Sequence, residues 1–221
     1  HRRSVLLLAL ACPAAAATQA RLMPVTPEQP EGQALVARLR AGGLVLFFRH
    51  ADTSGEPCDR SYALGDRAGQ RNLSAAGRAQ AARIGARLRE LGIPLQEPVL
   101  AGPVYRARDT AELAFGKERV EVTDSLLADD YAGNRLGWVL AEHRRLFAAP
   151  VPAGVNRVLV GHRTPAIMVA GESIGGRAFP EGAALVIEPR GSGAFEILES
   201  FEILGILMPA PLPQAGFHGC Q

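Results

Sequence analysis

The chain is organised around one stretch, Leu44-Val45-Leu46-Phe47-Phe48-Arg49-His50-Ala51-Asp52-Thr53. Its bulky apolar residues follow a pair of glycines and give way abruptly to a cation and an imidazole. An apolar run of this composition predicts a strand that is buried on both faces of a parallel sheet. Because ligands of open α/β sheets bind at the carboxyl ends of the strands, we expect Arg49 and His50 to lie at a functional site.

A second stretch, Arg157-Val158-Leu159-Val160-Gly161-His162, repeats the pattern of an apolar run that ends in a histidine. If both strands are parallel members of one sheet, His50 and His162 project from the same edge. A third segment, residues 98–112, predicts a strand, a Gly-Pro turn and a helix with Arg106 in its first turn. A cation there opposes the helix dipole, but the conflict disappears if a bound anion such as phosphate shares the site.

Four short motifs resemble those of a known family, the histidine phosphatase superfamily, which has the phosphoglycerate mutase-like fold. In the family's order they are Arg49-His50-Ala51, Arg71-Asn72-Leu73-Ser74-Ala75-Ala76-Gly77 with Gln80-Ala81, Gly102-Pro103-Val104-Tyr105-Arg106-Ala107-Arg108-Asp109-Thr110-Ala111, and Gly161-His162. The resemblance covers residues 33–190. The chain departs from the pattern at three positions: Ala51 replaces a glycine, Gly102 replaces a serine, and Arg163 follows the second histidine where one branch has aspartate.

The resemblance implies an α/β fold: a three-layer α/β/α sandwich around a mostly parallel central sheet, in a single domain. It also implies that His50 is the nucleophile and that phosphate is bound by Arg49, Arg106 and His162. Guanidinium groups match phosphate oxygens and supply the positive charge that phosphoryl transfer requires, so we expect no metal and no cofactor. His50 must be neutral to attack, and two flanking arginines disfavour its protonation.

The general acid that protonates the leaving oxygen stays open at this point. The resemblance implies an acidic residue between Arg106 and His162 when none follows the second histidine. Asp130 and its neighbour Asp129 form the best-placed pair, and Glu181 is the alternative.

A long, irregular and charged segment connects His50 to Ser74. Long loops of this kind in compact domains are often functional, so we expect this one to wall the substrate pocket. The candidate substrate contacts are Thr53, Arg60, Arg67 and Arg71.

Length and composition suit one domain, because the chain has 221 residues, of which 48% are hydrophobic. Residues 1–20 have the basic, apolar and small-residue regions of a secretory signal peptide, and the apolar part is too short for a stable membrane span. Residues 21–32 read as a Pro-rich linker, 33–208 as the histidine phosphatase domain and 209–221 as a flexible tail. We therefore expect a periplasmic or secreted protein, with a lipoprotein as the less favoured alternative.

Three cysteines are present, and Cys12 falls within the predicted signal peptide. An exported protein permits a disulfide between the remaining two, Cys58 and Cys220, although the sequence does not decide whether it forms. Among the helices, residues 134–149 predict an amphipathic helix with Trp138 directed inward and His143 on a solvated face. Residues 183–188 and 194–198 predict a hairpin at the edge of the sheet.

These features favour an exported phosphomonoester hydrolase that works through a phosphohistidine on His50. A net charge of +2 gives no reason to expect a nucleic-acid partner. The expected partner is a small phosphorylated substrate, and the oligomeric state stays open. Two alternatives remain: a non-catalytic phosphate-binding module, or a phosphotransferase similar to phosphoglycerate mutase.

Overall fold

A seven-stranded sheet forms the centre of the computed structural model, which describes residues 20–191 and 201–213. The strands are β1 (Pro24–Val25), β2 (Val45–Arg49), β3 (Val99–Ala101), β4 (Val120–Val122), β5 (Arg157–Gly161), β6 (Ala184–Pro189) and β7 (Phe201–Leu207). They lie in the order β1-β7-β6-β2-β5-β3-β4. Most neighbours are parallel, whereas β6 is antiparallel to both β2 and β7. The predicted mostly parallel sheet is therefore confirmed.

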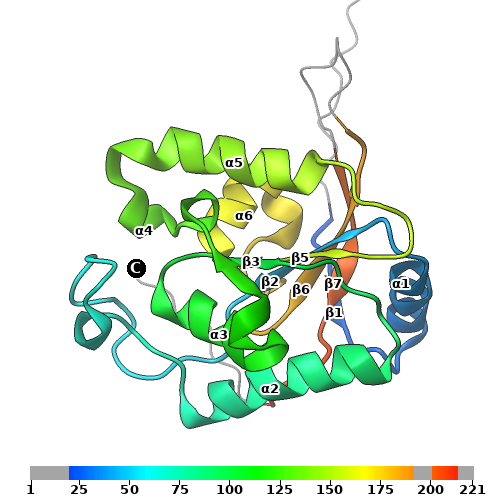
Figure 1. The fold of residues 1–221 in the computed structure, drawn as a ribbon, viewed down its shortest axis with the longest axis horizontal. Coiled ribbons are helices and arrows are strands. Elements are labelled where there is room, and N and C mark those ends of the chain that lie inside the picture. The colour runs from blue at the N-terminus through cyan, green and yellow to red at the C-terminus, as the bar shows by residue number, and fades with distance from the viewer. Residues whose placement is uncertain (1–19, 192–200, 214–221) are drawn as a thin grey trace, which may run out of the picture.

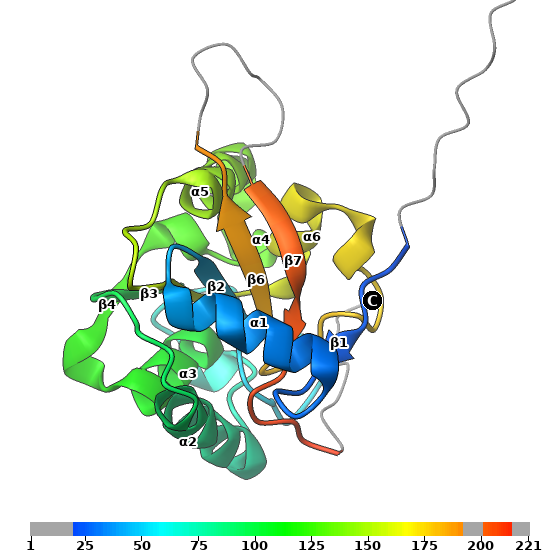
Figure 2. The ribbon, with the colours of Figure 1, turned by 90° about the vertical axis from the view of Figure 1, so that its right-hand side faces the viewer.

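Six α-helices surround this sheet within the described residues. They are α1 (Pro30–Ala41), α2 (Ala75–Glu90), α3 (Tyr105–Phe115), α4 (Asp129–Ala132), α5 (Leu136–Ala148) and α6 (Arg163–Ala170). Helices α2 and α3 lie on one side of the sheet, and α5 and α6 lie on the other (Figure 1). Helix α1 crosses β6 and β7 (Figure 2). The arrangement is the predicted three-layer sandwich.

Strand β2 lies in the interior of the sheet, and all five of its residues are buried. Successive side chains of a strand point to opposite faces. Leu46 and Phe48 accordingly join the hydrophobic cluster that α1, α2 and α3 complete, while Val45 and Phe47 join the cluster under α5 and α6. This double burial explains why the run is apolar at every position up to Arg49.

The register of β2 and β5 determines the position of the two histidines. Arg49 pairs with Gly161 in the parallel ladder. His50 and His162 therefore follow the ends of neighbouring strands, and the His50 backbone N–H donates to the Gly161 carbonyl at 3.1 Å. Because parallel strands end at the same edge, both imidazoles lie at one end of the sheet.

Two inferences about side-chain burial are wrong. His143 is completely buried, because its Nδ1 lies 2.9 Å from the Val139 carbonyl oxygen and its ring packs against Phe47 and Phe147. Trp138 is 46% exposed, and the Arg135 guanidinium lies 5.8 Å from the centre of its ring.

The predicted edge hairpin also differs from the structure. Strand β6 is an interior strand, and its hairpin partner is β7 at Phe201–Leu207. Residues 194–198, which we expected to form the partner strand, lie outside the described part of the chain. The segment 21–32, expected to be a linker, contains β1 and the start of α1.

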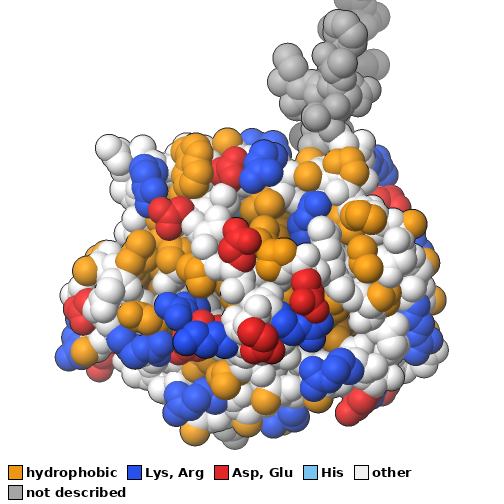
Figure 3. Space-filling view, in the orientation of Figure 1, with side chains coloured by type: hydrophobic (Ala, Val, Ile, Leu, Met, Phe, Trp, Pro, Cys, Tyr) orange, Lys and Arg blue, Asp and Glu red, His pale blue; other side chains and the backbone are white. Residues whose placement is uncertain are grey.

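The predicted signal peptide lies outside the described residues except for its last position, as do Cys12, Cys220 and most of the predicted tail. Among the residues that the structure describes, no helix combines the length and the apolar character needed to cross a bilayer. On the face shown in Figure 3, basic side chains gather at the lower left with acidic ones between them.

Candidate active site

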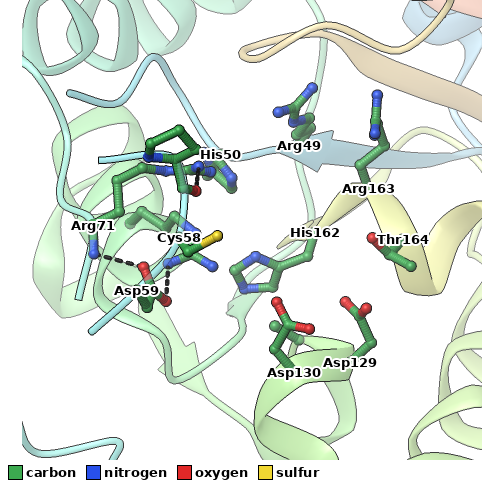
Figure 4. A pocket seen from close by; sticks show the side chains of 13 residues that line it. Arg49, His50, Cys58, Asp59, Arg71, Asp129, Asp130, His162, Arg163 and Thr164 are labelled. Carbon is green, nitrogen blue, oxygen red and sulfur yellow. Dashed lines mark hydrogen bonds and ion pairs between the residues drawn. The ribbon is translucent and has the colours of Figure 1, made fainter. Parts of the chain in front are cut away.

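A pocket opens at the carboxyl end of the central strands, with a volume of about 130 Å³. Most of its lining is charged or polar. The lining residues are Arg49, His50, Pro57, Cys58, Asp59, Arg71, Arg106, Ala128, Asp129, Asp130, His162, Arg163 and Thr164. The pocket therefore brings together the ends of β2 and β5, the first turn of α3, the start of α4 and the loop that follows His50 (Figure 4).

His50 has a fixed tautomer. Its Nδ1 lies 2.9 Å from the Ala51 carbonyl oxygen, which can only accept, so Nδ1 carries the proton and Nε2 has a free lone pair. The pKa of His50 lies well below the usual value for histidine because the ring is buried and because Arg106 and Arg49 add positive charge beside it. The side chain is therefore a neutral imidazole at neutral pH, with its unprotonated nitrogen available as a nucleophile.

Two motif residues hold the chain that follows His50. The Thr110 hydroxyl accepts from the Ala51 N–H at 2.9 Å, and Gln80 Oε1 accepts from the Asp52 N–H at 2.9 Å. Gly77 permits α2 to approach this segment, since a Cβ there would lie 1.9 Å from the Asp52 carbonyl oxygen. These three motif residues thus support the backbone of the site, and none of them needs a direct part in the reaction.

Arg49 is buried, and both of its terminal nitrogens donate hydrogen bonds within the protein. Nη1 donates to the Phe179 carbonyl at 3.1 Å, and Nη2 forms an ion pair of 3.0 Å with Glu181. Burial lowers the pKa of Arg49 to about 10, and the Glu181 carboxylate counteracts this effect. Arg49 consequently remains charged at neutral pH.

Arg106 is held by Asp59, a residue that the sequence did not single out. Arg106 Nη1 donates to Asp59 at 2.8 Å, and the same carboxylate accepts from the Tyr131 hydroxyl and from the Arg71 N–H. Burial opposes the ionisation of Asp59, but the hydrogen bond from Tyr131 and the charge of Arg106 outweigh it and lower the pKa of Asp59. Asp59 is therefore an anion that restrains Arg106, and it belongs to the loop expected to wall the pocket.

His162 lies at the end of the strand next to β2, beside His50. The centre of its ring lies 5.5 Å from that of His50, and the residue directly precedes α6. The pKa of His162 lies well below the usual value because of burial and the charge of Arg106. Four buried nitrogens of the pocket-lining residues have no hydrogen-bond partner among the described residues: Arg49 Nε, Arg71 Nε, Arg106 Nε and His162 Nε2.

Asp129 and Asp130 lie across the pocket from Asp59 and Arg71, with the His162 ring between the two groups (Figure 4). Asp130 is exposed, whereas Asp129 is only partly so. The pKa of Asp129 is raised by burial and by the neighbouring charge of Asp130. A carboxyl group that keeps its proton more readily than usual is suited to act as a general acid.

Seven of the residues predicted from the sequence line this pocket together: Arg49, His50, Arg71, Arg106, Asp129, Asp130 and His162. The other three do not. The Thr53 hydroxyl donates to Glu181 at 3.1 Å, Arg60 donates to the Ala68 carbonyl, and Arg67 forms a two-point ion pair with Asp109. Glu181, the alternative acid, is completely buried and is absent from the pocket lining.

Among the described residues, no group of three or more His, Cys, Asp or Glu side chains is arranged so that it could bind a metal ion. Cys58, which lines the pocket, is disulfide-bonded, and its partner lies outside the described residues.

Comparison with solved structures finds proteins that are similar to this chain at low sequence identity. The protein histidine phosphatase SixA, complexed with tungstate, is 17% identical, with a TM-score of 0.47 over 75% of this chain and 97% of that chain. The mycobacterial glucosyl-3-phosphoglycerate phosphatase, complexed with inorganic phosphate, is 21% identical, with a TM-score of 0.45 over 73% of this chain and 95% of that chain. No curated protein matches the chain.

The family comparison addresses the motifs directly. Residues 45–134 match the family model of the histidine phosphatase superfamily (branch 1). This range contains the first three motifs on which the resemblance was based, including His50 and Arg106. The match confirms the resemblance predicted from the sequence, and it shows that residues 45–134 are similar to the histidine phosphatase superfamily.

Proposed function

We propose that this chain is a phosphomonoester hydrolase that forms a phosphohistidine at His50. One observation carries the proposal: a neutral imidazole with its free Nε2 shares a pocket with buried, unpartnered nitrogens of three arginines and a second histidine. Forked guanidinium donors match the oxygens of a phosphoryl group. A buried donor without a partner is costly, and an oxyanion in the pocket removes that cost.

The proposed reaction has two steps. In the first, His50 Nε2 attacks phosphorus in line, and the bond between phosphorus and the ester oxygen breaks as the leaving oxygen takes a proton from Asp129. In the second, water attacks the phosphohistidine and gives a proton to the Asp129 carboxylate. The products are the alcohol and inorganic phosphate, and the side chains return to their starting states.

The positive charge of the pocket serves the transition state. Phosphoryl transfer is catalysed mainly by positioning and by neutralising charge on the equatorial oxygens. Arg49 and Arg106 are each already fixed by a carboxylate, so they need little reorganisation during the reaction. The cavity of about 130 Å³ is smaller than the roughly 300–1,000 Å³ of typical ligand pockets. This supports a site that encloses the phosphoryl group while the leaving group extends to the mouth.

The proposal is tested with the purified protein and p-nitrophenyl phosphate in excess chelator. We expect hydrolysis, inhibition by vanadate or tungstate, and loss of turnover in His50→Ala with the fold retained. Wild-type protein that is denatured rapidly without acid should carry acid-labile phosphate on His50. A protein that binds phosphate without hydrolysing any phosphomonoester in a metabolite screen would instead be the non-catalytic binding module. Activity that vanishes with chelator and returns with a divalent ion would overturn the mechanism.

We also propose that the chain is exported. The support is the signal-like pattern of residues 1–20 and the disulfide at Cys58, because disulfides persist mainly in oxidising compartments. Fractionation of bacterial cells that express the chain with and without residues 1–20 tests this. We expect the chain that includes residues 1–20 in the periplasm or medium and the shortened one in the cytosol. Equal retention of both chains in the cytosol would refute export.

A further inference from the structure

Glu181 is a buried anion whose environment excludes the role of general acid. Its side chain is 0% exposed and both of its oxygens accept hydrogen bonds. Oε1 accepts from Arg49 Nη2 at 3.0 Å and from the Thr53 hydroxyl at 3.1 Å, and Oε2 accepts from the Thr53 N–H at 3.2 Å. A second cation, Arg71 Nη2, lies 3.9 Å from Oε1. All of these neighbours are donors, so the carboxyl group is held as the charged acceptor.

The backbone around Glu181 is attached to the strand end that carries the nucleophile. The Gly182 N–H donates to the His50 carbonyl at 2.9 Å, and the Arg49 N–H donates to the Ala183 carbonyl at 3.0 Å. Gln80 Nε2 donates to the Glu181 carbonyl at 3.3 Å. These hydrogen bonds to the main chain on both sides of Glu181 hold the residue in place relative to His50, although the two residues are far apart in the sequence.

The contacts of Glu181 also determine which donor Arg49 has left for a ligand. Nη2 is engaged by Glu181 and Nη1 by the Phe179 carbonyl, while Nε is buried without a partner among the described residues. We propose that Glu181 is a positioning residue that orients Arg49 and Arg71 so that their remaining donors meet the phosphoryl group in the transition state. The proposal rests on the proposed phosphatase function, and it assigns Glu181 no contact with substrate.

This role predicts opposite effects on binding and on turnover. Replacing Glu181 by Gln removes one negative charge next to the phosphate-binding arginines, so a ground-state anion should bind at least about threefold more tightly. The same change loosens Arg49, and misplacing a catalytic group by about 1 Å can cost on the order of 100-fold in rate. A general loss of structure would not improve anion binding. The combination of tighter phosphate binding and slower turnover therefore separates positioning from folding.

The test compares Glu181→Gln with the wild type and with Glu188→Gln, a matched control whose carboxylate forms an exposed ion pair with Arg38. The measurements are kcat and KM for p-nitrophenyl phosphate, and the Kd and stoichiometry of inorganic phosphate by calorimetry. We expect Glu181→Gln to lower kcat about 10- to 100-fold while phosphate binds more tightly with wild-type stoichiometry. Glu188→Gln should match the wild type in every measurement.

Two outcomes for Glu181→Gln would overturn the inference. One is an unchanged kcat, and the other is a loss of phosphate affinity that parallels the loss of kcat. If Glu181→Gln does not fold, Thr53→Val decides the question, because it removes one donor to Glu181 and should lower kcat in the same direction without weakening phosphate binding. A lower kcat with weaker phosphate binding in Thr53→Val, or an unchanged kcat, would refute positioning. An inactive wild-type protein would refute the phosphatase function itself, so the two failures are distinguishable.

Discussion

The carboxylate of Asp59 lies 2.8 Å from the guanidinium of Arg106, although 47 positions separate the two residues. Both side chains are almost completely buried at the pocket. The Tyr131 hydroxyl donates to the same Asp59 oxygen at 2.5 Å. Arg106 is therefore oriented by a chain of contacts that begins on α4 and passes through the loop after His50.

The first prediction tests this chain of contacts. Tyr131→Phe removes the hydroxyl donor and leaves Asp59 less restrained, so kcat/KM should fall by about tenfold or more, because a hydrogen bond to a charged group is worth about 1.5–3 kcal/mol. Tyr62→Phe is the matched control, because Tyr62 packs against Tyr131 but is 48% exposed. Steady-state kinetics on p-nitrophenyl phosphate measure both variants. Equal losses in the two variants would show that the hydroxyl bond to Asp59 has no special role.

The motif residues could be predicted from the sequence because their positions follow from local patterns. An apolar run ending in Arg49-His50 defines β2, and a second such run defines β5, so the meeting of His50 and His162 follows from the parallel pairing of strands. Neither Asp59 nor the role of Glu181 as a partner of Arg49 could be predicted. Glu181 is 132 residues from Arg49, and nothing in its local sequence distinguishes a buried counter-ion from a solvated loop carboxylate.

Tertiary contacts also decide the elements that the sequence analysis misjudged. The tetrapeptide Phe-Glu-Ile-Leu occurs at residues 195–198 and again at 201–204, so local preference cannot choose between them. In the described part of the chain, the copy at residues 201–204 belongs to β7, where Phe201 pairs with Pro189. His143 has charged neighbours in sequence, yet it is buried because its ring packs on Phe47. An imidazole with one bonded nitrogen can be buried, which a charge pattern does not reveal.

The second prediction concerns the disulfide of Cys58. Cys58 precedes Asp59, and Arg71 donates to the Pro57 carbonyl at 2.5 Å, so this short segment fixes two side chains of the pocket. Reduction should loosen the segment and raise KM several-fold. Cys58→Ser should show the raised KM with or without reductant. A wild-type KM that does not respond to reductant, with thiol titration confirming that the disulfide is broken, would contradict the prediction.

The third prediction concerns stability against acid. The pKa values of His50, His162 and His143 are all lowered in the folded protein, with burial as the largest cause. Below the unfolded value of about 6.5, the unfolded chain binds more protons than the folded one, so stability falls as the pH falls from there toward the lower folded pKa values. Above pH 6.5 the histidines are mostly neutral in both states, and their burial no longer opposes folding. The free energy of unfolding should therefore decrease between pH 6.5 and pH 5.

The substitution His143→Leu isolates the contribution of one histidine to the pH dependence of the unfolding free energy, and His143 does not line the pocket. It should remove up to about 1.4 kcal/mol per pH unit, the contribution of one proton, from the pH dependence of the unfolding free energy. Denaturant titrations at several pH values provide the measurement. Glu142→Gln is the control on the same helix, because the pKa of Glu142 is lowered to about 2, chiefly by Arg145, and it stays ionised throughout this window. Identical slopes in wild type and His143→Leu would mean that His143 is not neutral in the fold.

The last prediction assigns the general acid. Sequence reasoning put Asp130 first, but the partial burial of Asp129 and its raised pKa favour Asp129. An aryl leaving group departs as a stable anion, whereas an alkyl leaving group needs a proton. Asp129→Asn should therefore lower the rate on glycerol phosphate by about two to four orders of magnitude and spare p-nitrophenyl phosphate much more.

The pH profile separates the two aspartates further. Because Asp129 must be protonated to donate, the rate on glycerol phosphate should fall as the pH rises through its pKa. Asp130→Asn removes the neighbouring negative charge that raises the pKa of Asp129, so this falling limb should move to lower pH while the plateau rate is largely kept. If Asp130→Asn instead shows the loss that is selective for alkyl substrates, and Asp129→Asn behaves like the wild type, then Asp130 is the acid and Asp129 only its neighbour.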